Sequence, residues 1–316
     1  MATWIVAEEL EGAVSASTLE LASKARTFGE VHALYLGAGS DAAFAELGDH
    51  GVVSVFHLET GDALPSAAAA AALSELISSH GGDLVLLGMS TTERDVAGRL
   101  AARIGKPVIS NALDVSVADG VTATSEILGG TRSVTTRATD GSPAIVLTRP
   151  KAFTAEPAGG STPTVTSVPV PETGHSGAAT VTERHVEVSE GPDLGSARVV
   201  VTGGRGLGSP EKFDMMAELA GLLGGAVGGT RAVVDAGWVP YSYQIGQTGK
   251  TVKPNVYIAC GVSGAMQHVV GMKGASTIIA INKDPDAPIF SIADLGVVGD
   301  LHSVVPKLIE ALRSSG

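Results

Sequence analysis

Apolar residues fall into two kinds of pattern along the first hundred positions of the chain. Short runs in which nearly every residue is apolar alternate with longer segments in which apolar residues recur every three or four positions. The runs predict strands and the periodic segments predict amphipathic helices. The predicted strands cover residues 5–7, 31–36, 52–57 and 84–87, and the predicted helices cover 17–27, 41–47, 64–79 and 91–104. Such a series predicts a parallel sheet with helices on both faces, a doubly wound α/β fold.

Beyond residue 108 the pattern changes to alternating apolar and polar positions. Segments 121–128, 133–137 and 144–148 are separated by turn pairs such as Gly129-Gly130 and Asp140-Gly141. Alternation interrupted by such pairs is typical of antiparallel hairpins. We therefore expect the first domain to end in a small antiparallel β appendage.

A segment rich in proline and glycine, residues 157–195, separates this series from a second one. We expect it to be a connector with one strand candidate, residues 181–188; a structured crossing loop within a single domain is the alternative. The second series has predicted strands at 199–202, 256–260 and 277–281, and predicted helices at 212–223, from 263 onward, and at 301–313. The sequence thus predicts two doubly wound α/β domains, 1–190 and 191–316.

Charge is distributed unevenly between these two domains. The 316 residues include 21 Lys+Arg and 33 Asp+Glu, a formal net charge of −12. Up to residue 190 there are 11 basic and 23 acidic residues, which gives 11 − 23 = −12, and the remainder has 10 of each. Because neither domain has a basic excess, we expect no nucleic-acid partner.

Hydropathy and cysteine content bear on the compartment. Mean hydropathy is +0.27, yet no apolar stretch approaches the ~18 residues of a membrane helix. We therefore expect a soluble protein with no direct membrane insertion. The chain has one cysteine, Cys260, so no internal disulfide can form, and its first residues show no basic, cleavable leader pattern. These features predict a cytoplasmic location.

Two glycine-containing segments resemble nucleotide-binding motifs. Gly37-Ala-Gly39-Ser-Asp-Ala42 fits G-x-G-x-x-A, and Glu59 follows at about the spacing of a ribose acceptor. The segment follows the second predicted strand rather than the first, so we favour a tight strand-to-helix turn. Residues 246–251, Gly-Gln-Thr-Gly-Lys-Thr, resemble a P-loop, but Gln244 stands at the first glycine position and Pro254 obstructs the helix that must follow. We reject this segment as a Walker A site.

A third segment, Gly203-Gly-Arg-Gly-Leu-Gly-Ser209, follows a predicted strand but fits G-x-G-x-x-G in no register. Glycines at a strand end allow backbone N–H groups to approach an anion, a following helix adds partial positive charge, and Arg205 adds a full one. This combination predicts a diphosphate site, with a glycine-rich turn packed under a helix as the alternative. Polar loops follow the domain's other strands as well, and ligands of open α/β sheets bind where such loops meet. The loops therefore predict an extended, phosphate-containing ligand.

Residues suited to acid–base or nucleophilic chemistry are scarce near these loops. The sequence shows no nucleophile triad, carboxylate pair or metal-ligand spacing there. Cys260, at a strand end, is expected to be a small buried residue rather than a nucleophile, and His268 to be a capping or surface histidine. A bound cofactor is therefore expected to carry the chemistry.

Five segments of the second domain follow one another in a recognisable order. They are Gly203-Gly-Arg-Gly-Leu-Gly-Ser, Ala232-Val-Val-Asp-Ala-Gly-Trp-Val-Pro, Gly246-Gln-Thr-Gly-Lys, Ser263-Gly-Ala-Met-Gln-His and Ala280-Ile-Asn-Lys-Asp-Pro-Asp-Ala-Pro-Ile-Phe. Together they resemble the C-terminal domain of electron transfer flavoprotein alpha subunits, densely over residues 199–312 and more weakly over the first domain. This resemblance implies an alpha/beta heterodimer with one FAD, held mainly by the second domain and covered by the beta subunit.

The same resemblance implies a role. Members of the family carry electrons from acyl-CoA dehydrogenases of fatty acid β-oxidation and similar flavoenzymes to a membrane quinone oxidoreductase or the respiratory chain. The chain is therefore expected to be an electron carrier rather than a stand-alone enzyme. Two alternatives stay open: an adenine-nucleotide-using enzyme acting through residues 37–42, and a scaffold whose acidic first domain only docks a partner.

Carried over position by position, the resemblance implies a set of FAD contacts. Arg205 and its neighbouring glycines resemble diphosphate and adenosine-side contacts, and Asn282, Asp300 and Leu301 lie nearer the adenosine. Thr230 stands where many members have serine. The full implied set is Arg205, Gly206, Thr230, Arg231, Ile245, Gly246, Gln247, Thr248, Ser263, Gly264, Ala265, Met266, Gln267, His268, Asn282, Asp300 and Leu301.

Four of these residues resemble contacts to the isoalloxazine ring. Arg231 resembles the guanidinium that lies against the ring, Thr248 the hydroxyl that reaches its N5 edge, and Gln247 a neighbour of the ring. His268 resembles the group near the C2 carbonyl. Because negative charge accumulates near N1 and C2=O on one-electron reduction, we expect Arg231 and His268 to supply positive charge and hydrogen-bond donors there.

Overall fold

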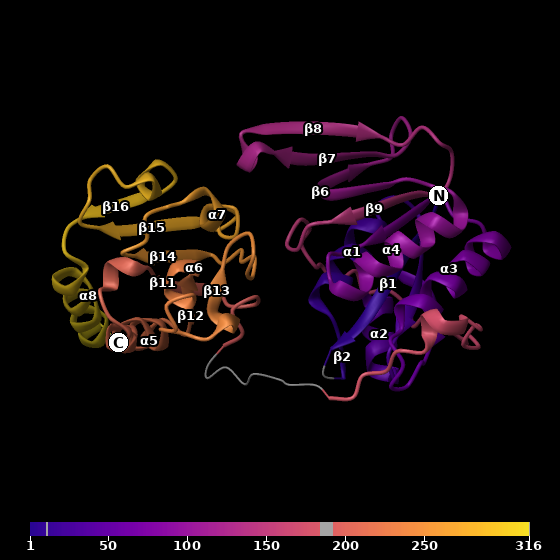
Figure 1. Ribbon diagram of the computed structural model, residues 1–316, viewed down its shortest axis with the longest axis horizontal. Coiled ribbons are helices and arrows are strands. Elements are labelled where there is room, and N and C mark those ends of the chain that lie inside the picture. The colour runs from indigo at the N-terminus through magenta and orange to yellow at the C-terminus, as the bar shows by residue number, and fades with distance from the viewer. Residues whose placement is uncertain (11, 184–191, 316) are drawn as a thin grey trace. The chain divides into compact units, whose positions relative to one another are not determined.

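The protein, described by a computed structural model over residues 1–10, 12–183 and 192–315, divides into two compact units, Met1–Arg184 and His185–Gly316 (Figure 1). The boundary predicted near residue 190 and most of the strand predicted over 181–188 lie outside the described residues. The described part of that segment, 181–183, forms no strand.

The first unit is built on a ten-stranded sheet. Its strands are β1 (Ala2–Leu10), β2 (Ala13–Val14), β3 (Glu30–Leu36), β4 (Val52–Leu58), β5 (Leu84–Leu87), β6 (Val108–Ser116), β7 (Thr122–Ile127), β8 (Arg132–Arg137), β9 (Ala144–Thr148) and β10 (Thr164–Ser167). They follow the order β10-β4-β3-β1-β5-β9-β6-β7-β8, with β2 paired to β1. The pairs from β10 to β6 are parallel, whereas β6–β7 and β7–β8 are antiparallel.

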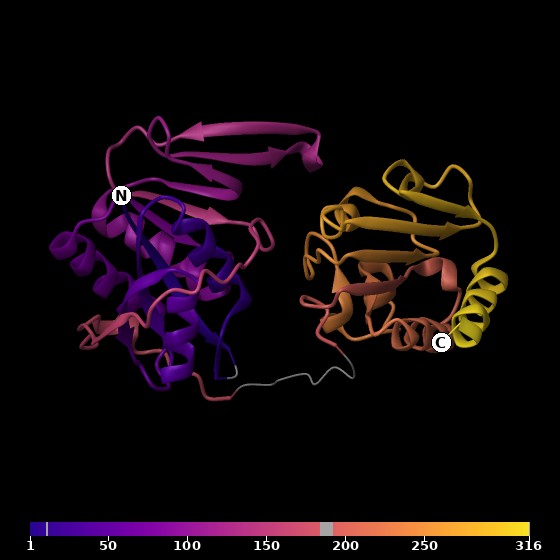
Figure 2. The same cartoon turned by 180° about the vertical axis from the view of Figure 1, so that it is seen from behind.

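Helices cover both faces of this sheet (Figure 2). Helices α1 (Ala16–Ala25) and α2 (Asp41–Asp49) bury Leu21 and Leu47 against one face. Helices α3 (Ser66–His80) and α4 (Thr91–Ile104) bury Leu73 and Leu100 against the other. Short 3-10 turns, η1 (Leu128–Gly130) and η2 (Gly174–Gly177), complete the unit. The predicted doubly wound α/β class is confirmed for this unit.

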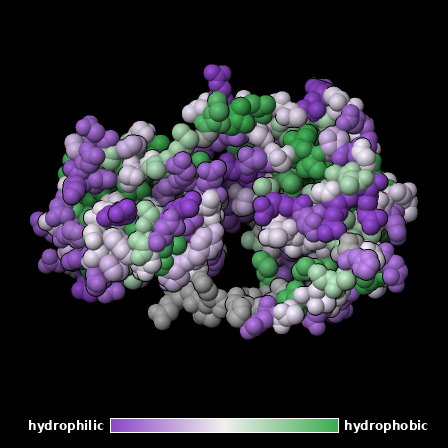
Figure 3. Space-filling view, viewed as in Figure 1, coloured by the Kyte–Doolittle hydropathy of each residue, from purple (hydrophilic) through white to green (hydrophobic). Residues whose placement is uncertain are grey.

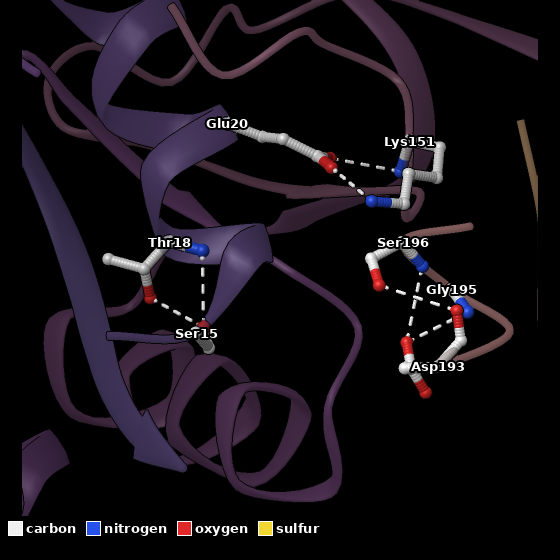
Figure 4. A network of polar contacts seen from close by, with 7 residues as sticks. All are labelled: Ser15, Thr18, Glu20, Lys151, Asp193, Gly195 and Ser196. Atoms are coloured by element: carbon white, nitrogen blue, oxygen red, sulfur yellow. Dashed lines mark hydrogen bonds and ion pairs between the residues drawn. The ribbon is translucent and has the colours of Figure 1, made fainter. Parts of the chain in front are cut away.

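Polar side chains cap the N-terminus of α1 and connect the helix to a neighbouring loop (Figure 4). The Ser15 hydroxyl accepts from the Thr18 N–H at 3.2 Å and so caps the helix. Inside the helix, Glu20 accepts from the Lys151 N–H at 3.0 Å and pairs with the Lys151 ammonium at 3.1 Å. The loop after β9 is thereby tied to α1.

The antiparallel appendage differs from the prediction in one strand. Residues 144–148 do not form a hairpin strand, because β9 lies parallel between β5 and β6 and is buried along its whole length. Its continuous apolar run, Ala-Ile-Val-Leu, is typical of such a central strand. The antiparallel part consists of β7 and β8, which continue the same sheet from β6, and every residue of β8 is exposed.

The second unit has a six-stranded, fully parallel sheet. Its strands are β11 (Val199–Gly203), β12 (Ala226–Thr230), β13 (Gln244–Ile245), β14 (Val256–Cys260), β15 (Thr277–Asn282) and β16 (Leu295–Val298), in the order β13-β12-β11-β14-β15-β16. All five pairings are parallel. The chain adds strands outward on one side of β11 and then on the other, which places a topological switch point between β11 and β14.

The faces of this sheet are covered differently. Helices α5 (Phe213–Leu222) and α8 (Leu301–Ser315) bury Met216 and Val305 on one face. The other face is covered by loops and short turns whose buried side chains include Met272 and Ile289. The remaining elements are α6 (Arg231–Val234), α7 (Met266–Val269) and the 3-10 turns η3 (Arg205–Leu207), η4 (Pro210–Lys212), η5 (Tyr241–Tyr243) and η6 (Pro288–Ser291).

Among the described residues, no helix has the length and apolar character needed to cross a membrane. Within the same residues, no cluster of three or more His, Cys, Asp and Glu side chains is arranged to hold a metal ion.

Candidate functional site

A cleft of about 690 Å³ opens in the second unit at the carboxyl ends of its parallel strands. Its walls come from the loops that follow β11, β12, β13, β14 and β15. The cleft therefore lies at the switch point, where ligands of open α/β sheets bind. Its volume is within the usual range for a cofactor site.

The structure brings most of the predicted contact residues together in this cleft. Those that line it are Arg205, Gly206, Thr230, Arg231, Ile245, Gly246, Gln247, Thr248, Ser263, Ala265, Gln267, His268 and Asn282. Four predicted residues, Gly264, Met266, Asp300 and Leu301, are not among its lining residues.

Gly264 and Met266 stand at the start of α7. Gly264 has φ +85°, and a Cβ there would lie 2.2 Å from the Ile289 backbone nitrogen. The helix predicted from residue 263 therefore begins only at Met266, and it is a single turn. The Met266 side chain is half exposed.

Asp300 and Leu301 stand at the start of α8. The Asp300 carboxylate accepts from the His302 N–H at 3.0 Å. Leu301 is buried in the hydrophobic core on the α8 side of the sheet. It lies close to Gly261, since a Cβ added at Gly261 would be 2.8 Å from Leu301 Cδ2. Both residues therefore have structural roles next to the cleft wall.

Glycines bring the loops after β11 and β14 into close contact. A Cβ on Gly204 would lie 2.3 Å from the Gly261 carbonyl oxygen, and one on Gly206 would lie 2.7 Å from Gly261 Cα. The N–H groups of Gly204 and Gly206 donate to the carbonyls of Cys260 and Gly261, each at 3.0 Å. These two N–H groups are thus used within the protein, which revises the expected backbone cradle for an anion.

Arg205 is the cationic side chain of this loop. It is exposed, lines the cleft, and has no ion pair with any residue in the described part of the chain. The expected help from a helix N-terminus is absent here, because two 3-10 turns intervene and α5 begins only at Phe213. An anion at this position would therefore depend on the guanidinium.

Arg231 begins α6 and faces the same cleft. Its Nε–H donates to Asp235 Oδ2 at 3.2 Å, an i,i+4 pair in which both side chains are more than half exposed. Asp235 also lines the cleft. A pair this exposed contributes little to stability, so the guanidinium is available to a ligand.

Thr248 is held at both its polar ends. The Gln244 carboxamide Nε2–H donates to the Thr248 hydroxyl oxygen at 3.0 Å. The Tyr241 hydroxyl donates to the Thr248 carbonyl. Gln244 is buried at the start of β13, whereas Thr248 is exposed in the cleft.

His268 is buried, not on the surface, and both of its ring nitrogens are engaged. Nδ1 lies 3.0 Å from the Ile245 carbonyl oxygen, so Nδ1 carries the hydrogen and donates it. Nε2 lies 2.8 Å from the Tyr257 hydroxyl and accepts from it. Burial raises the pKa of Tyr257, which keeps that hydroxyl protonated.

The charge of His268 follows from this environment. Burial lowers the pKa of His268 to about 4, against a weaker opposing effect of the hydrogen bond to Ile245. The imidazole is therefore neutral at pH 7. A neutral imidazole does not supply the positive charge that was expected from His268, so the geometry favours Arg231 as the source of that charge.

Asn282 connects two walls of the cleft. Its Nδ2–H donates to the Val262 carbonyl at 2.9 Å, and its Oδ1 accepts from the Asp284 N–H at 3.0 Å. Both ends of the carboxamide are thus used to hold the loops after β14 and β15. A role toward a ligand would have to use their remaining hydrogen-bonding capacity.

Sequence reasoning missed several lining residues. They are Ala232, Asp235, Gly261, Val262, Asp284, Ala287 and Pro288. Asp235 and Asp284 lie within segments that carried the family resemblance, close in sequence to Arg231 and Asn282. This short spacing was the signal that could have identified them as lining residues. Cys260, by contrast, is fully buried as expected, and burial raises the pKa of its thiol to about 12.

The G-x-G-x-x-A segment of the first unit is occupied by a carboxylate of the chain itself. Glu9 Oε2 accepts from the Gly39 N–H at 2.8 Å and from the Tyr35 hydroxyl at 2.9 Å. A Cβ on Gly37 would lie 2.6 Å from the same oxygen. Ser40 caps α2 by accepting from Ala43 N–H. The loop thus serves as a strand-to-helix turn that holds a negative group.

Comparison with known proteins matches a separate family model to each of the two units. A family model described as "Electron transfer flavoprotein domain" matches residues 3–173, and one described as "Electron transfer flavoprotein FAD-binding domain" matches residues 193–273. The electron transfer flavoprotein subunit alpha of Mycobacterium leprae is 40% identical over 317 residues, which cover 98% of each chain. That of Paracoccus denitrificans is 40% identical and covers 98% of this chain and 99% of its own. Protein FixB of Clostridium saccharobutylicum is 36% identical and covers 97% and 94%, respectively.

Proposed function

This chain belongs to the electron transfer flavoprotein alpha subunit family, and we propose that it is the FAD-bearing half of a heterodimer that carries electrons between flavoenzymes and a membrane quinone oxidoreductase. Its second unit contains the family's FAD-binding domain. The observation that carries the proposal is the cleft at the switch point of that unit, with two arginines on its walls.

The residues of the cleft fit an FAD. We assign the diphosphate to Arg205, which has no ion pair with any described residue, and the isoalloxazine to Arg231 and Thr248; all three side chains line the cleft. The other predicted lining residues would complete the site, while Gly264, Met266, Asp300 and Leu301 would support it from outside. When bound, the isoalloxazine supplies the capacity to accept and release electrons.

The cleft has few groups suited to acid–base catalysis. His268 is neutral at pH 7 with both nitrogens hydrogen-bonded, and the Cys260 thiol is buried with a raised pKa. Asp235 and Asp284 are exposed carboxylates on its walls. These features support an electron carrier rather than a stand-alone enzyme.

The proposed partners are an electron transfer flavoprotein beta subunit, acyl-CoA dehydrogenases as electron donors and a membrane quinone oxidoreductase as acceptor. We assign partner docking to a first domain of residues 1–190 and FAD binding to residues 191–316, in the cytoplasm.

In support of docking, Ile127, Leu128 and Val134 are exposed at the end of the β7–β8 pair, where Figure 3 shows a green surface patch. Exposed apolar clusters of this kind are typical of interaction sites.

The alternative of an adenine-nucleotide enzyme acting through residues 37–42 is disfavoured by Glu9. A phosphate bound at this loop would meet the Glu9 carboxylate, which already accepts from the Gly39 N–H. Two negative groups at one site repel each other strongly when partly desolvated. The loop therefore lacks the positive environment that a nucleotide phosphate needs.

Visible absorption of the chain co-expressed with its beta subunit tests the proposal. We expect a yellow complex with about one FAD per heterodimer, which takes up electrons from an acyl-CoA dehydrogenase and its substrate. A colourless complex that binds ATP through the first unit would favour the enzymatic alternative. A colourless complex that binds no nucleotide would favour a scaffold.

A further inference from the structure

The loop that carries Thr248 is held in place by Gln244, which precedes the loop on β13. The Gln244 carbonyl accepts from the Lys250 N–H at 2.7 Å, and the Gly246 N–H donates to the Lys250 carbonyl at 3.2 Å. Gly249 approaches so closely that a Cβ there would lie 2.3 Å from the Gln244 carbonyl oxygen. The backbone thus brings the Thr248 side chain back over that of Gln244.

The hydrogen bond between these two side chains has a defined direction. Gln244 Nε2 is a donor only, so at 3.0 Å it occupies one lone pair of the Thr248 hydroxyl oxygen. A hydroxyl has one hydrogen, and that hydrogen cannot point back at an N–H group. It is therefore directed away from Gln244, and Thr248 lines the cleft.

Gln244 is well suited to impose this direction. Its side chain is 3% exposed, so its carboxamide is largely shielded from competing water. The Tyr241 hydroxyl holds the carbonyl of Thr248 from the other end. The threonine therefore has little freedom to exchange its donor role for an acceptor role.

We propose that Gln244 is a positioning residue that fixes the Thr248 hydroxyl as a hydrogen-bond donor to the bound flavin ring. This inference rests on the proposed function, in which Thr248 meets the N5 edge of the isoalloxazine. The positioning effect belongs to a side chain that does not itself line the cleft.

A fixed donor discriminates between protonation states of the ring. N5 is an acceptor in the oxidised flavin and after uptake of one electron without a proton. Uptake of the second electron with a proton from solvent converts N5 to N–H, a donor. Two donors then face each other, so Gln244 favours the first electron step over the second.

The test uses the flavin-loaded heterodimer and four variants: Gln244→Met, Thr248→Val, Thr248→Ser and the double variant Gln244→Met/Thr248→Val. The first readout is the ¹⁵N chemical shift of flavin N5, which reports the hydrogen bond directly. The second is the midpoint potential of the first electron, from a potentiometric titration. We expect Gln244→Met and Thr248→Val to change the N5 shift in the same direction as each other and to lower the potential in both cases. The expected fall in potential is ~59 mV, which corresponds to an about tenfold change in the equilibrium constant of the first electron step.

The double variant separates positioning from other effects. If Gln244 acts through the hydroxyl, the double variant matches Thr248→Val alone, because no hydroxyl remains to be positioned. Thr248→Ser keeps the hydroxyl and should retain the wild-type N5 shift. An N5 shift and potential unchanged by Gln244→Met, or changes that add in full to those of Thr248→Val, would overturn the inference.

A second substitution guards against misfolding of the methionine variant. Gln244→Glu keeps the shape of the side chain; at a pH high enough to ionise this buried carboxyl, its carboxylate accepts from the Thr248 hydroxyl and so draws the hydrogen out of the cleft. It should remove the N5 hydrogen-bond shift as Thr248→Val does, and retention of that shift would contradict the inference. A wild-type complex that contains no flavin would instead refute the proposed function.

Discussion

Acidification from pH 8 to pH 5 should lower the free energy of unfolding of the second unit by about 2 kcal/mol through His268 alone. The folded-state pKa of His268 is about 4, below the ordinary value of 6.5 that applies once the chain is unfolded. Below pH 6.5 the unfolded chain binds a proton that the folded chain excludes, so the unfolded state is favoured. The loss grows until the pH passes below about 4, where it reaches about 3 kcal/mol.

The main structural cause of the lowered pKa is burial of the imidazole, and the hydrogen bond to Tyr257 adds to it. Nε2 accepts from Tyr257, and it cannot do so once it carries a proton. His268 is only 6% exposed, so a charged imidazole would lose its hydration, and the hydrogen bond to the Ile245 carbonyl offsets this loss only in part. Both effects oppose the protonated form in the folded state.

Urea denaturation of the full-length chain at the two pH values measures this effect. The chain has two tryptophans, and a Trp4→Phe background leaves Trp238, which packs on Phe213 in the second unit, as the fluorescent probe. His268→Gln should flatten the difference between pH 8 and pH 5 by about 2 kcal/mol. His302→Gln, at an exposed position on α8, is the matched control and should leave the difference unchanged. An equal pH dependence in parent and His268→Gln would refute the reasoning.

Three further outcomes follow from the geometry. Arg231→Ala should leave FAD content largely intact but lower the potential of the first electron by ~59 mV or more in a potentiometric titration, because a charge near the ring is worth at least ~1.4 kcal/mol. An unchanged potential would exclude a role of Arg231 in stabilising the reduced ring. Gly204→Ala should destabilise the second unit by ~3 kcal/mol in urea denaturation, because the new Cβ would collide with the Gly261 backbone. The control Gly221→Ala, in open space on α5, should stabilise the unit by ~0.5 kcal/mol, and equal effects of the two substitutions would contradict the close contact at Gly204. Glu9→Leu should lower the free energy of unfolding of the first unit by ~2 kcal/mol, because it removes the acceptor of the Gly39 N–H and the Tyr35 hydroxyl, and Glu9→Gln should lower it by less. Calorimetry should detect no ATP binding to either variant, and ATP binding to the parent chain would support the nucleotide alternative.

The fold was predictable where burial and sequence pattern coincide. The predicted ranges 84–87 and 256–260 match β5 and β14 residue for residue, because both strands are apolar along their length. Strand β12 was missed because Gly228 and Gly229 resemble a turn. Gly228 is instead needed inside the sheet, since a Cβ there would lie 2.4 Å from Ile245 Cδ1.

The location of the site was more predictable than its internal bonding. Polar residues after successive parallel strands must meet at one edge, and this predicted a shared site for the loops that carry Arg205, Arg231 and Thr248. The strands before the last two of these residues, β12 and β13, were themselves not predicted. Sequence could not show that the Gly204 N–H is taken by the Cys260 carbonyl, because that depends on how closely two distant loops approach. The neutral state of His268 depends in the same way on Tyr257, which lies on another strand.

The two basic groups that were expected to act together on the ring differ in what they can do. Arg231 is exposed and held by one i,i+4 pair with Asp235, which is worth only ~0.3–0.5 kcal/mol. Its guanidinium can therefore leave Asp235 for an anionic ligand at small cost. His268 would have to break a buried hydrogen bond to Tyr257 before it could carry charge. In this cleft Arg231 is thus the adaptable charge, while Tyr257 and His268 form a fixed neutral wall beside it.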